Sequence, residues 1–364
     1  MKKAKVKLAP MDFVMFSIVM LLVVIGVIMV LSASTYMPGQ SHVGAFLKQS
    51  FSALLGVVAL IFTQRFDYHN IKKYTNLLMI ISMILLIAVL FTGSINGAQR
   101  WIPLGPFGTL QPSEIAKYVA VFYMAKSMDH KGERIKSFFY GVVPILMVSG
   151  LFAAIILKEK NLSIASVIMI VTIIMLFAAG SKLSQMFILI PPLVGVGIFF
   201  IVSEPYRLLR LTGFLHPFDD RLGKGYQLVQ SLLALGSGGI LGVGLGRSRQ
   251  KALYLPEPNT DFIFAVIGEE LGLIGCVFII ILFVILIWRG IRTAINAKDT
   301  YGTLLAIGIT SVIAVQAIIN IAVVTGAMPV TGVPLPFISA GGSSLLFNMM
   351  AVGVLLNISR QANK

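Results

Sequence analysis

The chain has 364 residues, of which 57% are hydrophobic and 12% charged, and it carries a formal net charge of +15. Its mean hydropathy of +0.92 excludes a soluble globular protein, because apolar runs of about 20 residues are long enough to cross a bilayer as helices. These runs do not alternate between apolar and polar residues, which excludes an outer-membrane β-barrel. We therefore predict an all-α, polytopic membrane protein.

Ten apolar stretches are candidate membrane spans. In chain order they are residues 12–33, 44–64, 74–92, 111–127, 138–157, 162–180, 183–203, 262–288, 302–326 and 343–358. The first follows a basic start, but its apolar core is too long for a signal peptide, so we expect it to be retained. We treat residues 1–364 as one domain, with a long polar segment at 204–261 between the seventh and eighth spans.

The distribution of basic residues predicts the orientation of the chain. Most Lys and Arg residues fall in segments that ten spans place on the same side as the N-terminus. Because such segments stay in the cytoplasm, we expect both termini to be cytoplasmic and the 204–261 segment to be extracellular. The net positive charge is thus mostly a consequence of this topology, and we expect membrane lipids to be partners of the protein. We expect no nucleic-acid partner, since no basic cluster is interleaved with aromatic residues on a soluble face.

The only cysteine, Cys276, lies in an apolar run. This excludes a disulfide framework and a thiolate metal site, and it predicts a small buried side chain.

The fourth span is the least apolar, because it contains Glu114 and Lys117. Their i,i+3 spacing puts them on one helix face, where they can pair, and Ser113 or a neighbour can cap the helix. Ionisable residues within a span are functional candidates by default. A purely structural ion pair explains the pattern about as well.

The 204–261 segment combines glycine, basic residues and a carboxylate immediately before the eighth span, Asp261. The Gly242-x-Gly-x-Gly246 run has no surrounding strand–turn–helix unit, so it is not a dinucleotide fingerprint. Its backbone amides, next to Arg247 and Arg249, could cradle a diphosphate. Charges that face solvent or lipid head groups are the alternative. Asp261 has an equally simple alternative as a helix cap.

Polar residues also mark the ninth span and the segment after it. Gln316 and Asn320 share one face and can form hydrogen bonds across helices. Residues 325–344 contain three prolines and several glycines. Such backbone is tolerated at membrane depth only when it is buried in protein or lines water, so we predict part of a cavity wall. In the eighth span, Glu269 lies about 12 Å below Asp261, while Glu270 points to nearly the face opposite Asp261, and at least one of the two should face the bundle interior.

Taken together, these motifs resemble the SEDS family (shape, elongation, division and sporulation) over nearly the whole chain. The stretches that carry the resemblance are Arg100-Trp101, Gln111–Lys117, Gly225–Ser231, Gly242–Gly246, Leu255–Ala265, Glu269–Gly272 and Pro329–Ser344. The segment from Tyr206 to Pro217 looks most like the division and sporulation branch.

The resemblance implies a peptidoglycan glycosyltransferase with ten helices that polymerises lipid II at the outer face of the bacterial cytoplasmic membrane. It also implies a class B penicillin-binding protein as partner, and a role in division, elongation or sporulation. The family's essential aspartate corresponds to Asp261. Its early arginine, glutamate and lysine correspond to Arg100, Glu114 and Lys117.

Transfer from a lipid diphosphate needs a base and positive groups near the leaving group. We predict that Asp261 is the base, with a pKa raised by desolvation. The predicted substrate-binding residues are Arg100, Glu114, Lys117, Arg247, Arg249, Lys251 and Ser343. No nucleotide is needed. The chemistry is compatible with a divalent cation such as magnesium, but the sequence identifies no metal ligands.

The chain departs from the family pattern after the fifth span, where it has Glu159-Lys-Asn-Leu-Ser-Ile164. Lys160 replaces a proline and Ile164 a threonine, which puts a contribution of this loop to the site in doubt. We expect restoration of both to change activity less than about tenfold. Two other functions fit the same residues: a flippase of lipid-linked precursors, with charged residues and broken helices in the membrane, and a non-catalytic scaffold.

Overall fold

The structure, a computed structural model, describes residues 10–36, 41–93, 99–105, 108–220, 223–252 and 254–362. The predictions about the basic N-terminal start lie outside these residues. The helices are α1 (Phe13–Ala33), α2 (His42–Arg65), α3 (Tyr68–Val89), α4 (Pro112–Lys131), α5 (Val143–Lys158), α6 (Leu162–Ala178), α7 (Leu183–Val202), α8 (Pro205–Leu215), α9 (Tyr226–Gly238), α10 (Ile263–Ile295), α11 (Thr300–Val324) and α12 (Gly342–Gln361). A short 3₁₀ helix (Gly132–Lys136) and a π-helical turn (Phe138–Val142) join α4 to α5.

The ten predicted spans correspond to α1 through α7 and α10 through α12. Eight helices of the described chain are long and apolar enough to cross a membrane. The remaining two are α6, which has 17 residues, and α4, which carries several charged side chains. The prediction of an all-helical polytopic membrane protein is confirmed. A two-residue antiparallel hairpin, β1 (Ile102–Pro103) with β2 (Thr109–Leu110), is a small addition that the sequence did not indicate.

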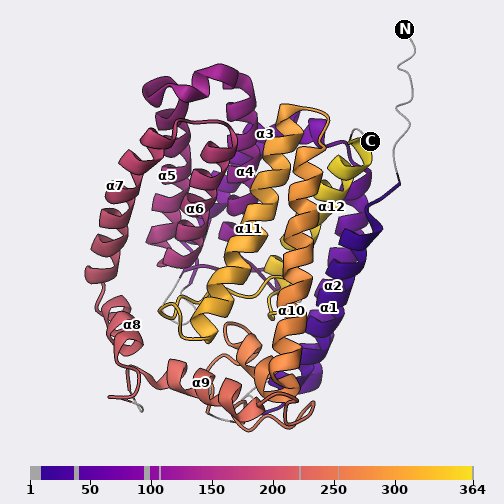
Figure 1. The fold of residues 1–364 in the computed structure, drawn as a ribbon, viewed down its shortest axis with the longest axis vertical. Coiled ribbons are helices and arrows are strands. Elements are labelled where there is room, and N and C mark those ends of the chain that lie inside the picture. The colour runs from indigo at the N-terminus through magenta and orange to yellow at the C-terminus, as the bar shows by residue number, and fades with distance from the viewer. Residues whose placement is uncertain are drawn as a thin grey trace.

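Figure 1 shows how the bundle is arranged. Helix α1 begins and α12 ends at one end of the bundle, whereas α8 and α9 lie across the opposite end. The segment predicted as a long loop therefore contains two helices. Helix α11 is the most enclosed of the long apolar helices in the described chain, with 67% of its apolar stretch buried, whereas α3 and α7 are the most exposed, with 17% buried in each. The polar face of α11 is thus held inside protein, where its side chains need partners.

Helix α10 is broken at Gly272, which has φ of 68° and ψ of −166°. The break frees two carbonyls and two amides, and the loop after α9 pairs with all four. These hydrogen bonds run from Val243 N to Glu269 O (3.0 Å), Gly244 N to Glu270 O (3.0 Å), Leu273 N to Gly239 O (2.9 Å) and Ile274 N to Ile240 O (3.2 Å). A Cβ on Gly272 would lie 2.4 Å from Gly242 N. Glycine is therefore required for two backbones to meet within the bundle.

The chain between α11 and α12 is irregular and largely buried, as predicted from its prolines. Val333, Leu335, Phe337 and Ile338 are all buried. The segment packs closely on α1, because a Cβ on Gly26 would lie 2.6 Å from Phe337 O. The non-helical backbone is therefore enclosed by helices, which is the condition for its stability at membrane depth.

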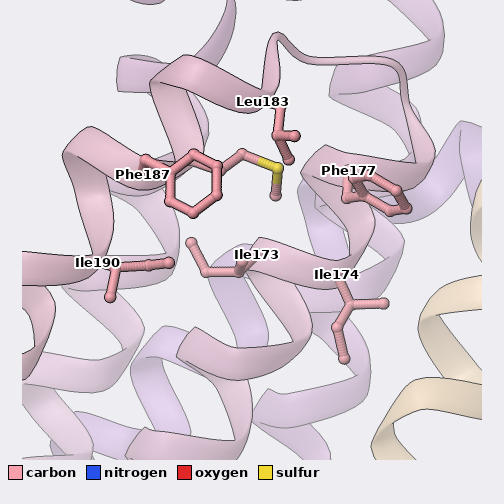
Figure 2. Close-up of a pocket in the computed structure, with 7 residues that line it drawn as sticks. Ile173, Ile174, Phe177, Leu183, Phe187 and Ile190 are labelled. Carbon is pink, nitrogen blue, oxygen red and sulfur yellow. The ribbon is translucent and has the colours of Figure 1, made fainter.

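An apolar pocket of about 310 Å³ lies between α6 and α7 (Figure 2). It is lined by Ile173, Ile174, Phe177, Leu183, Met186, Phe187 and Ile190, and by no polar side chain. It lies where α6 ends and α7 begins, at the end of the bundle away from α8 and α9 (Figure 1). Its lining offers no group for acid–base or phosphate chemistry, so it is not a candidate active site.

Candidate active site

Asp261 lies immediately before α10, near the end of the bundle that carries α8 and α9. It is half-buried. The N-cap residue of α10 is Phe262, and no side chain caps the helix. The carboxylate is therefore not used as a helix cap, which leaves it available for chemistry.

The surroundings of Asp261 raise its pKa to about 6. Burial is the main cause, and the nearby charge of Glu257 adds to it, while Arg210 and Arg100 oppose the shift. A carboxylate with this pKa is largely ionised at neutral pH and yet is a stronger base than an ordinary aspartate. The expected rise in pKa by desolvation is in line with this environment.

The backbone around Asp261 is fixed by α11 and by the segment that follows it. Asn320 Nδ2 donates to Asp261 O and to Val333 O, each at 2.8 Å. Ser339 Oγ donates to Thr260 O at 2.6 Å, and Ala340 N donates to Asn259 O at 2.8 Å. The prediction that Asn320 forms hydrogen bonds across elements is confirmed. These bonds hold the residues before α10 in one position.

Two arginines bring positive charge to Asp261, since both lower its pKa. Arg100 Nε donates to Glu159 O at 3.2 Å, and its Nη2 donates to Lys160 O. Arg210, on α8, donates through Nη1 to Val330 O at 3.2 Å. Arg210 was missed as a site residue in the sequence. Its signal was present in the stretch from Tyr206 to Pro217, which we used only to compare branches of the family.

Glu114 and Lys117 form the predicted ion pair, with 2.6 Å between Lys117 Nζ and Glu114 Oε2. Lys117 Nζ also donates to Gln316 Oε1 on α11 at 3.0 Å. Both charged side chains are buried. The expected side-chain cap by Ser113 or a neighbour is not formed: Gln111 is the N-cap without a side-chain bond, and Pro112 starts the helix. Ser113 lies inside α4 and accepts hydrogen bonds from Gln111 Nε2 and Asn161 Nδ2 instead.

The residues that follow the Gly242–Gly246 run bind a carboxylate of the protein, Glu269. Arg249 N donates to Glu269 Oε1 at 2.8 Å, Gln250 N donates to both of its oxygens, and Ser248 Oγ donates to Oε2. The amides of Val243 and Gly244 are taken by carbonyls of α10. The amides of Val243 and Gly244 are therefore not available to a diphosphate, whereas binding of a diphosphate elsewhere in this loop stays a prediction.

Lys251 lies in a second buried cluster. Its Nζ is 2.6 Å from Glu270 Oε1 and 2.8 Å from Ser32 Oγ on α1. Arg247 and Arg249, by contrast, are exposed. Both Glu269 and Glu270 are buried, although adjacent residues of a helix point about 100° apart. The loop folds over both carboxylates, so they share one interior. Lys251 therefore has an ion-pair partner within the protein, the carboxylate of Glu270.

Ser343 connects the hairpin to α12. Its Oγ donates to Thr109 O at 2.8 Å and accepts from Gln111 N at 3.2 Å. Among the predicted site residues, the structure therefore brings Arg100 towards Asp261. Glu114 and Lys117 lie on α4 and face α11, Lys251 contacts α1, and Ser343 of α12 contacts the hairpin. A substrate contact by any of them remains a prediction.

Glu159 was also missed as a site residue, although it belongs to the loop whose sequence departs from the family. It is the C-cap of α5, its side chain is buried, and Arg100 binds its carbonyl. A carboxylate directly after an apolar span was the signal in the sequence.

A site for the divalent cation that the chemistry allows would need several oxygen ligands close together. The described residues contain no group of three or more His, Cys, Asp or Glu side chains that could hold a metal ion. Glu257 is close enough to influence Asp261, but two carboxylates alone are an incomplete ligand set.

The fold and this site define a polytopic helical membrane protein with a carboxylate and two arginines at one end of the bundle. Residues 12–364 match the profile of the FtsW, RodA and SpoVE family, described as "Cell cycle protein". The chain belongs to this family, which confirms the resemblance.

Individual relatives and solved structures agree. The chain is 45% identical to stage V sporulation protein E of Bacillus subtilis, with 96% of this chain and 97% of the relative covered. It is 44% identical to the probable peptidoglycan glycosyltransferase FtsW of Trichlorobacter lovleyi, with 97% and 94% covered.

A structure described under "Structural coordination of polymerization and crosslinking by a peptidoglycan synthase complex" superposes with a TM-score of 0.78, at 26% identity, with 96% of this chain and 98% of that chain covered. The rod shape determining protein RodA of Thermus thermophilus superposes with a TM-score of 0.72, at 24% identity, with 97% and 98% covered. The similarity to RodA supports the fold of this chain.

Proposed function

We propose that the protein is a peptidoglycan glycosyltransferase that polymerises lipid II, with Asp261 as the general base. Family membership and the names of its relatives support the activity. The observation that carries the assignment of Asp261 is its environment. It is a carboxylate outside the spanning helix, free of a capping role, with a pKa raised to about 6 and two arginines within electrostatic reach.

The transfer step follows from these groups. A hydroxyl of the acceptor sugar attacks the anomeric carbon of the donor, and the bond from that carbon to the diphosphate oxygen breaks. The hydroxyl proton passes to Asp261, and the lipid diphosphate leaves with its electron pair. Positive charge from Arg100 and Arg210 stabilises the negative charge that develops on the leaving group.

The exposed side chains of Arg247 and Arg249 are the further candidates for the diphosphate. Their loop is held rigidly, because Glu269 accepts several hydrogen bonds from it. Lys251 supports that loop through Glu270. Because Glu114 and Lys117 are buried, substrate could reach them only if the bundle opens around α4. In the structure described, this pair connects α4 to α11 through the hydrogen bond from Lys117 to Gln316.

The orientation and the partner belong to the same proposal. Both termini are cytoplasmic, so that Asp261 works at the outer face on lipid II. This places the base on the side where glycan is assembled. A class B penicillin-binding protein is the partner, as expected of an enzyme that resembles a component of a peptidoglycan synthase complex. The similarity to stage V sporulation protein E and to FtsW favours a role in sporulation or division.

The test is the length of glycan that purified protein makes from lipid II in the presence of its partner. Asp261→Asn keeps the size of the side chain but removes its ability to accept a proton, so polymerisation should fall about a hundredfold or more. Insertion and partner binding should persist. The matched control is Asp219→Asn, an exposed carboxylate in the same polar segment, which should behave like wild type.

Two outcomes would contradict the proposal. Full activity of Asp261→Asn would remove the assignment of the base. No polymer from any variant, with the partner verified as bound, would favour the flippase, because detergent solution offers no second leaflet.

A further inference from the structure

Glu159 is a buried carboxyl whose side-chain oxygens accept no hydrogen bond from any residue that the structure describes. Its relative exposure is 0%. An ionised carboxylate in such a place loses its hydration without compensation, whereas the neutral acid does not. Burial accordingly raises the pKa of Glu159 to about 8, even though the nearby Arg100 opposes the shift. At neutral pH the side chain is mostly uncharged.

Arg100 binds the backbone of the same loop. It donates to the carbonyls of Glu159 and Lys160, which are presented by the end of α5. That end has a defined geometry: Lys160 has φ of 60°, Lys160 N donates to Leu157 O at 2.9 Å, and Asn161 N donates to Ile156 O at 3.2 Å. This pattern is a Schellman motif, in which the residue after the helix adopts a left-handed conformation.

The guanidinium of Arg100 thus interacts electrostatically with two carboxyl groups. Arg100 lowers the pKa of Glu159 and also that of Asp261, so its charge reaches both. If Glu159 ionises, it competes with Asp261 and with a bound diphosphate for the same cation.

We propose that Glu159 is a positioning residue of the transfer reaction, which must be uncharged so that Arg100 is directed to Asp261 and the substrate diphosphate. Ionisation of Glu159 draws Arg100 towards the loop and weakens the site. This inference rests on the proposed function, because it uses Arg100 as a group that acts on the diphosphate. Turnover would then depend on the protonation state of Glu159, a residue that does not touch the reacting atoms.

The other charged groups near this loop are accounted for. Lys158 and Lys160 have exposed side chains, so water screens them. On the neighbouring α4, Glu114 and Lys117 neutralise each other. Asn161 is uncharged, caps α6 and contacts Ser113. Arg100 is therefore the charged group that acts on Glu159 within the described part of the chain.

The first test compares pH profiles of lipid II polymerisation for wild type and Glu159→Gln, each with its partner. Glutamine keeps the neutral shape of the acid but cannot ionise. Wild type should lose activity about tenfold between pH 7 and pH 9, as a group with a pKa of about 8 loses its proton. Glu159→Gln should lose less than about twofold over the same range. Glu133→Gln, on an exposed side chain, should follow wild type. An unchanged alkaline limb in Glu159→Gln would overturn the inference.

The second test needs no catalysis. A carboxyl whose pKa is higher in the folded than in the unfolded state destabilises the folded protein as pH rises between the two values. The apparent thermal midpoint of wild type in detergent should therefore fall relative to that of Glu159→Gln from about pH 4.5 to about pH 8, and the gap should then stay constant. A gap that does not depend on pH would contradict a neutral buried Glu159.

The two tests also separate this inference from the proposed function. If Asp261→Asn keeps full activity, the proposed base fails, whatever the thermal data show. If polymerisation behaves as proposed but Glu159→Gln shares both the alkaline limb and the thermal profile of wild type, the role of Glu159 alone is wrong.

Discussion

Gly332 lies directly against the carboxylate of Asp261. A Cβ built on Gly332 would be 3.2 Å from Asp261 Oδ2, and the residue has φ of 79°. Glycine is therefore favoured there for two reasons, since a side chain would be strained by the backbone and would press on the carboxylate. The irregular segment after α11 thus forms one side of the environment of Asp261.

We expect Gly332→Ala to lower polymerisation about tenfold or more while it lowers stability by only about 1 kcal/mol, the typical cost of a left-handed alanine. The matched control is Gly326→Ala. Gly326 has a similar φ of 73°, but its nearest neighbouring atoms are leucine methyl groups at 3.5 Å. Glycan assays and thermal midpoints measure the two effects. An equal loss of activity in both variants would show that the contact with Asp261 has no special role.

The structure reverses one expectation about Lys160. We expected Lys160→Pro with Ile164→Thr to be tolerated, but Lys160 has φ of 60° and its amide donates to Leu157 O. Proline is confined to φ near −65° and has no N–H, so it cannot adopt this geometry. We now expect Lys160→Pro to lower the thermal midpoint and to displace Arg100.

Two further variants test this explanation for Lys160. Lys160→Gly should raise stability by up to about 1 kcal/mol, because glycine tolerates the left-handed conformation. Lys160→Ala removes the charge but keeps the strain, and it should remain near wild type. If proline proves as stable as glycine, the backbone of this loop must differ from the one described.

The ion pair between Lys251 and Glu270 should be strongly coupled to stability. Lys251→Met leaves Glu270 buried without its cation, at a cost of about 3 to 5 kcal/mol. Lys251→Met with Glu270→Gln should regain part of that loss. Lys136→Met, which breaks an exposed pair with Glu133, should have little effect. Apparent thermal midpoints in detergent provide the measurement. A Lys251→Met protein that is stable but binds lipid II weakly would instead support a direct contact with substrate.

Cysteine labelling tests the orientation. Cys276 is buried and is the only cysteine, so Cys276→Ala provides a background without thiols. Lys224→Cys, in the polar segment, should react with an impermeant reagent on intact cells, and Lys298→Cys only after permeabilisation. Both positions are exposed, which makes an absence of labelling interpretable. The reverse pattern would invert the topology.

The sequence by itself determined the membrane class, the positions of the ten spanning helices and the Glu114–Lys117 pair. Each of these depends on local chemistry. A run of about 20 apolar residues has one stable conformation across a bilayer, and an i,i+3 spacing places two side chains together on any helix. The irregular, buried segment before α12 was predictable for the same reason, since its prolines exclude a helix.

Only the tertiary structure decided which polar groups are paired within the protein and which remain available to a substrate. The amides of the Gly242–Gly246 run looked suited to phosphate, but those of Val243 and Gly244 pair with carbonyls of α10 that the break at Gly272 leaves free. Lys251 is a predicted substrate ligand, and only the structure shows that it pairs with Glu270 on α10. Burial and hydrogen bonding depend on residues that are distant in the chain, and helical periodicity carries no information about a break or about what packs against it.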